Sequence, residues 1–136
     1  MDAKKPLPVP LGMLVCDSII EDRRTGKKSL IGLFSTVTTP QMPCVLAHFG
    51  VFITMTEGIG EYSCRLLCSY AADDAVLGET NGNVRFNDRR EVVEIALDVR
   101  GLSLARYGEY RFDFYCGGGL LISRMITVVP PPAVNP

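Results

Sequence analysis

The residues that could carry out chemistry in this chain are few, and none of them forms a complete catalytic set. The single histidine, His48, lies four residues after Cys44, which makes the two side chains candidates for a nucleophilic cysteine–histidine pair. Such a pair needs the thiolate within hydrogen-bond reach of the imidazole. Because Cys44 falls in an expected loop and His48 on the polar face of an expected strand, we interpret both as ordinary surface residues. The motifs of phosphate-binding loops, dinucleotide sites, zinc proteases and serine hydrolases are absent from the sequence, and we expect no enzymatic activity.

The spacing of the remaining metal-ligating residue types does not favour a metal site. Cys64 and Cys68 share one face of an expected strand, where a rise of ~3.3 Å per residue places them about 13 Å apart, too far to chelate one ion. Oxygen ligands occur in two expected loops, without the spacing of a calcium-binding loop: Asp73, Asp74, Asn81, Asn83, Asn87 and Asp88. Turn formation explains these residues equally well. We expect no cofactor and no metal.

Cysteine content and charge bound the compartment and the partners. The five cysteines are odd in number, and four lie in apolar strand patterns, which predicts buried free thiols in a reducing cytoplasm. The chain has 14 basic and 15 acidic residues, and the basic stretch 23–28 is flanked by Asp17, Glu21 and Asp22, so we expect no nucleic-acid partner. No apolar stretch is long enough to span a membrane, and the proline-rich start does not read as a signal peptide.

The elements that must position these residues are all expected to be strands. Residues 11–37 predict a long hairpin with a polar tip at 21–28, around which the rest of the chain is organised. Further alternating segments predict strands, joined by loops at 38–46 and 71–82: 47–55, 61–70, 83–86, 91–100, 110–116 and 120–129. This pattern predicts one domain over residues 11–129, between tails at 1–10 and 130–136. The predicted fold is all-β, a two-sheet antiparallel, immunoglobulin-like sandwich of seven or eight strands, with a closed β-barrel as the alternative.

Two details of the strands have structural or functional meaning. The tripeptide Gly-Glu-Tyr opens strands at 60–62 and 108–110, which predicts corners where a tyrosine hydroxyl bonds back to the backbone. Several strands also carry apolar residues on a second face, which a sandwich does not bury between its sheets: Leu14, Cys16, Ile20, Leu30, Phe34, Phe52, Leu67 and Tyr115. Two explanations are open: loops and tails cover the second face, or part of it forms an interface with another chain. The possible interface residues are Leu14, Leu30, Phe34, Phe52, Leu67 and Tyr115.

The chain resembles a bacterial family of small all-β proteins with a domain of unknown function. The resemblance is carried by the segments 15–34, Gly60-Glu61-Tyr62 and 108–124, and it extends over most of residues 11–129. It implies a bacterial all-β domain and no catalytic residues. We therefore expect a cytoplasmic, non-enzymatic protein-interaction or structural module that forms homo-oligomers or binds a protein partner. The alternative function is the binding of a small ligand or metal ion by the loops of residues 71–90.

Overall fold

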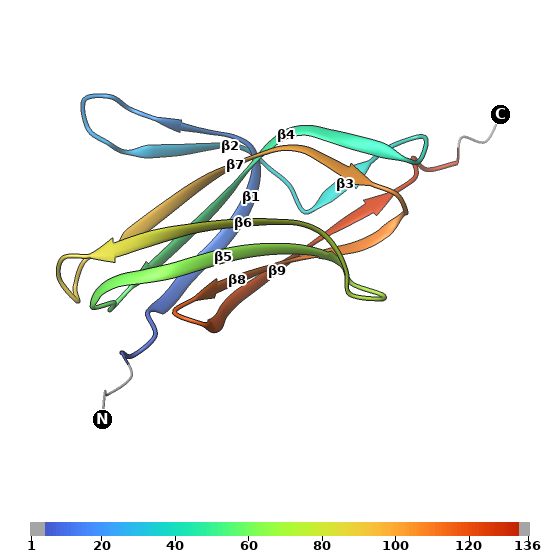
Figure 1. The fold of residues 1–136 in the computed structure, drawn as a ribbon. Coiled ribbons are helices and arrows are strands. Elements are labelled where there is room, and N and C mark those ends of the chain that lie inside the picture. Colours follow the sequence, from blue (N-terminus) through green and yellow to red (C-terminus); the bar gives the residue numbers. More distant parts are fainter. Residues whose placement is uncertain (1–4, 134–136) are drawn as a thin grey trace.

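A computed structural model describes residues 5–133 of the chain, and within them the fold is all-β (Figure 1). Nine strands follow one another along the sequence: β1 (Val9–Glu21), β2 (Lys28–Leu33), β3 (Thr36–Thr38), β4 (Cys44–Thr56), β5 (Gly60–Tyr70), β6 (Ala75–Phe86), β7 (Val93–Leu104), β8 (Gly108–Cys116) and β9 (Gly119–Val129). No helix in this part of the chain is long and apolar enough to cross a membrane. The expected tails lie partly outside the described residues, and β1 already begins at Val9.

The strands form two sheets that pack as a sandwich and do not close into a barrel. The four-stranded sheet has the order β2-β1-β4-β7, and the five-stranded sheet has the order β3-β9-β8-β5-β6. All neighbours are antiparallel except β3 and β9, which pair in parallel. The predicted two-sheet sandwich is confirmed.

The core lies between the two sheets because the apolar residues alternate along each central strand. Phe49 of β4 and Phe112 of β8 meet edge to face with their ring centroids 5.8 Å apart, and both are about 1% exposed. The same inner rows contain further buried residues from both sheets: Val15, Val51, Ile53, Met55, Leu104, Tyr110, Phe114, Ile126 and Val128. The inner row of β4 thus follows the alternation predicted for residues 47–55.

Tyrosine hydroxyls fix the two corners that open β5 and β8, as predicted. The Tyr110 hydroxyl donates to the carbonyl of Arg106 (2.6 Å) and accepts from its N–H (3.3 Å). The Tyr62 hydroxyl accepts from the N–H of Ile59 (3.0 Å) and donates to the carbonyl of Pro6 (2.8 Å). These bonds satisfy backbone groups that have no ladder partner where the chain enters each sheet.

The expected strand 29–37 is wrong, because the chain changes sheets within it. β2 ends at Leu33, and β3 pairs with β9 in the other sheet. Two backbone bonds hold the crossing: the N–H of Phe34 donates to the carbonyl of Val15 (3.0 Å), and the N–H of Thr127 donates to the carbonyl of Ser35 (2.9 Å). Shortly before the crossing, Gly32 has φ +72°, a left-handed conformation that favours glycine.

The expected loops 38–46 and 71–82 are also too long. β4 begins at Cys44. The second connection is only a turn, in which Asp74 has φ 57°, and β6 begins at Ala75. Small and polar residues such as Asn81 and Gly82 hid this strand in the sequence, because they lower strand propensity. Its pairing with β5 over the whole length, from Tyr70 opposite Ala75 to Gly60 opposite Phe86, overrides that propensity.

We expect the substitution Tyr110→Phe to lower the free energy of unfolding by about 1–2 kcal/mol, because both hydroxyl bonds to Arg106 are lost. Urea denaturation followed by circular dichroism measures this change. Tyr115→Phe is the matched control, since the Tyr115 hydroxyl makes no side-chain hydrogen bond within residues 5–133, and its effect should stay within about 0.5 kcal/mol. Equal losses for the two variants would contradict a structural role for the corner.

Candidate functional site

The residues predicted as an interface do not gather on one surface. Leu14 and Phe52 are register partners on the outer face of the four-stranded sheet. Leu67 and Tyr115 lie on the outer face of the other sheet. Phe34 packs against Phe49 of the core, with ring centroids 6.3 Å apart. The sixth residue, Leu30, pairs with Ile19 in the β1–β2 hairpin.

The β1–β2 hairpin itself covers part of the outer face of the four-stranded sheet. Ile19 lies so close to Gly50 of β4 that a Cβ on Gly50 would be 2.8 Å from Ile19 Cγ1. The Nζ of Lys28 also reaches Oε1 of Glu94 on β7, at 3.2 Å. Cys16, which pairs with Gly50, is fully buried as a result. The hairpin's other side exposes Ile20, Ile31 and Leu33.

Cys44 and His48 do not form a catalytic pair. Cys44 packs against the core, whereas His48 lies on the outer face of β4 in contact with Asp98 of β7. Asp98 also accepts a hydrogen bond from Nε of Arg100 at 2.8 Å, and Arg100 and His48 hold the pKa of this carboxyl below its usual range. The His48–Asp98–Arg100 cluster is an exposed surface network without a nucleophile.

The acidic residues of the turn 71–74 pair with arginines. Asp73 accepts from Arg106 at 2.8 Å, which lowers the pKa of Asp73, and Asp74 accepts from Arg111 at 2.8 Å. Arg111 also donates to Asp113 at 2.9 Å, and Ser123 bonds the other oxygen of this buried carboxylate. These contacts tie the turn to β8. Within residues 5–133, no three histidine, cysteine or acidic side chains are grouped to hold a metal ion.

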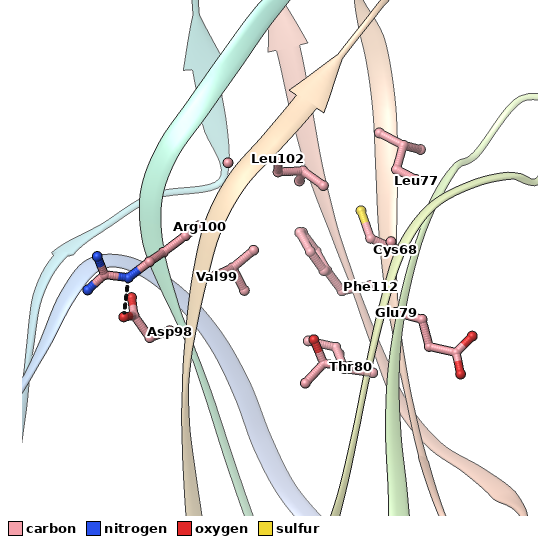
Figure 2. A pocket seen from close by; sticks show the side chains of 12 residues that line it. Cys68, Leu77, Glu79, Thr80, Asp98, Val99, Arg100, Leu102 and Phe112 are labelled. Atoms are coloured by element: carbon pink, nitrogen blue, oxygen red, sulfur yellow. Dashed lines mark hydrogen bonds and ion pairs between the residues drawn. The ribbon is translucent and has the colours of Figure 1, made fainter.

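The open side of the sandwich lies between β6 and β7, the edge strands of the two sheets. Figure 2 shows the cavity there, into which Val99, Leu102 and Phe112 project, while Arg100 and Asp98 turn away from it. Its volume is about 240 Å³, and a second cavity of about 140 Å³ shares Leu66 and Thr80 with it. Together the two cavities form a groove along the open side, in which the smaller cavity is mainly apolar and the larger one has a mixed lining that includes Glu79 and Thr80.

The β6 edge strand is the feature of this side that sequence reasoning missed. In the described residues, β6 pairs with β5 alone, so the backbone groups along its other edge have no strand partner. From residue 79 onward, its outward side chains are exposed and polar: Glu79, Asn81, Asn83 and Arg85. Its inward positions Gly78 and Gly82 carry no side chain, which leaves space beside the groove. One signal was available in the sequence: Glu79 and Arg85 lie at equal distances on either side of Gly82.

The seating of the hairpin on β4 can be tested with Gly50→Ala. We expect a loss of about 1–3 kcal/mol in the free energy of unfolding, because the added methyl group overlaps Ile19. Gly12→Ala on β1 is the matched control, since its Cβ would meet nothing nearer than Thr54 Cγ2 at 4.0 Å. Urea denaturation measures both variants. Ile19→Ala in the Gly50→Ala background should recover part of the loss, and strictly additive effects would show that the two residues do not press on each other.

The chain matches a known family over residues 11–129, which include all nine strands except the first two residues of β1. No curated protein matches the chain. The matching model is described as a family of unknown function, DUF6941. The all-β sandwich described above therefore belongs to the DUF6941 family.

Proposed function

We propose that the protein is a non-catalytic association module that forms a homodimer through the β6 edge. The observation that supports this is the unpaired edge of β6, a strand of 12 residues at the margin of the five-stranded sheet. Such an edge is a template for another strand, because its N–H and C=O groups point outward. Natural edges that avoid pairing often carry proline or rows of lysine, and β6 contains neither.

The charges of β6 are self-complementary. Antiparallel pairing of two β6 strands about a twofold axis at Gly82 sets Glu79 of one copy opposite Arg85 of the second copy, and the symmetry makes this pair twice. The same register sets Asn81 opposite Asn83 of the second copy. All these side chains lie on the outer face of the sheet. Each opposite-charge pair across neighbouring strands contributes roughly 0.2–1 kcal/mol.

A reducing compartment fits this module. All five cysteines are free thiols, and four of them are buried in the strands. We propose the bacterial cytoplasm as its location, which is the compartment that the cysteine content and the family resemblance favour.

Charge reversal on β6 tests the dimer. In the proposed register, Glu79→Lys sets lysine opposite Arg85 of the second copy at two places, and we expect the dimer dissociation constant to rise roughly tenfold or more. Arg85→Glu should have the same effect, and the double variant should restore association. Light scattering and analytical ultracentrifugation across a concentration series measure the constants.

The control for this test is Glu109→Lys, which changes an exposed acid in the interior of the same sheet and should leave the dimer intact. A monomer at every concentration would overturn self-association altogether. A stable dimer that ignores both reversals would place the interface elsewhere, with the exposed hairpin residues Ile20, Ile31 and Leu33 as the next surface to change.

A second candidate function is the binding of a small apolar ligand in the groove. Val99, Leu102 and Phe112 project into the larger cavity, and its volume of about 240 Å³ lies below the range of drug-sized ligand pockets, so only a small ligand fits. The sequence predicted the loops of residues 71–90 as the alternative ligand site, whereas the site proposed here lies on the inner side of β6.

Octanol is a suitable probe of this second candidate. We expect it to raise the thermal unfolding temperature of the wild-type protein and to have no effect on Gly78→Val, in which the new side chain fills the cavity. Gly82→Val is the matched control, because it lines only the smaller cavity and should keep the response. An unchanged melting temperature of the wild type over the soluble range of octanol would exclude this function.

A further inference from the structure

Two buried cysteines of the five-stranded sheet lie in direct contact. Cys64 of β5 and Cys116 of β8 are register partners, and their sulfur atoms are 3.4 Å apart. Both are reduced. Directly opposed residues of antiparallel strands have Cα atoms about 4.5–5.5 Å apart, which falls within the range of about 4.4–6.8 Å that a disulfide spans. The register of the two strands therefore allows the two sulfur atoms to bond.

The Cys64 side chain is also the one that small molecules can approach. Cys64 lines the cavity of about 140 Å³ between β6 and β7, whereas Cys116 is fully buried. On the β6 side, the register partner of Cys64 is Gly82. Apart from Gly82 and its chain neighbours, no heavy atom lies within 4 Å of the place where a Cβ on Gly82 would be. The missing side chain leaves room for a molecule of the size of a peroxide beside the Cys64 sulfur.

We propose that Cys64 and Cys116 form a peroxide-sensitive thiol pair, with Cys64 as the reacting and Cys116 as the resolving cysteine. The Cys64 thiolate attacks one oxygen of hydrogen peroxide, the O–O bond breaks, and hydroxide leaves, which gives a sulfenic acid at Cys64. The Cys116 sulfur then attacks the Cys64 sulfur, the S–O bond breaks, and water leaves. Two thiols lose two electrons and two protons, and one peroxide is reduced to two water molecules.

The place of Cys64 beside the cavity gives it the reacting role, and the environments of the two sulfur atoms agree with this. The hydrogen bond between the two thiols lowers the pKa of Cys64, whereas this bond, burial and the charge of Cys64 raise the pKa of Cys116. A lower pKa increases the thiolate fraction, which is the reactive form. Cys68, two positions along the same face, provides a contrast within the protein, because burial and nearby Asp113 raise its pKa to about 12.

The experiment treats the reduced full-length protein with hydrogen peroxide, alkylates the remaining thiols with N-ethylmaleimide in denaturant, and maps the cysteines by mass spectrometry. We expect a Cys64–Cys116 disulfide that dithiothreitol reverses, formed at least about tenfold faster than any oxidation of Cys68. In Cys116→Ser, Cys64 should accumulate as a sulfenic acid that dimedone traps. In Cys64→Ser, Cys116 should stay reduced. Cys68→Ser is the matched control and should form the disulfide at the wild-type rate.

The wild-type map decides the proposal even if a variant fails to fold. Oxidation of Cys68 or Cys16 as fast as that of Cys64 would overturn the assignment of a specific site. A Cys64 that stays reduced while free glutathione in the same solution is oxidised would overturn the proposed access. The disulfide map and the light-scattering measurement of the β6 dimer are separate readouts, so failure of the thiol pair and failure of the dimer can be told apart.

Discussion

The structure depends on one constraint: each sheet must bury an apolar row of side chains against the other sheet. The contact between Phe49 and Phe112 is the centre of this packing. Two sheets of four and five strands can satisfy this constraint only on their inner faces. Their outer faces and edges then need separate solutions. The tyrosine corners and the chain crossing between β2 and β3 hold the two sheets in the arrangement that brings the apolar rows together.

The two outer faces are stabilised by different kinds of interaction. On the four-stranded sheet, the β1–β2 hairpin brings Ile19 onto Gly50, so an apolar contact removes part of that face from water. On the five-stranded sheet, Arg111 joins Asp74 of the turn to the buried carboxylate of Asp113. Ion pairs at such partly exposed positions are weak individually, and their effect is to fix the turn that leads into β6.

The sequence predicted the parts of the fold in which alternation is strong. The rows around Phe49, Tyr62 and Phe112 predicted three central strands, and the repeated Gly-Glu-Tyr predicted both corners. β6 was missed because Asn81, Gly82 and their neighbours are poor strand formers, and only the ladder with β5 makes this segment a strand.

The contact between Cys64 and Cys116 and the packing over Gly50 could not be predicted, because each is formed by residues that are far apart in the sequence. Nothing in the sequence shows that Cys64 and Cys116 face each other, since register between distant strands depends on the whole sheet. The cover over Gly50 likewise depends on how the hairpin bends back onto its own sheet. The pattern of apolar residues on a second face does not show that Leu14 and Tyr115 lie on different sheets, or that Phe34 packs against the core.

The pairing of β3 with β9 has a consequence for the order in which the chain folds. Thr36 finds its partner Thr127 only after the strands β4 to β8 have been synthesised. The central strand of the five-stranded sheet, β8, also leaves the ribosome after β5 and β6 of the same sheet. The early β1–β2 and β5–β6 hairpins can form locally, but their inner faces stay without a partner until β8 and β9 arrive, and closing such long loops is slow. The nascent chain therefore exposes Phe49 and its apolar row until β8 has been synthesised, and chaperones can bind this surface during that time.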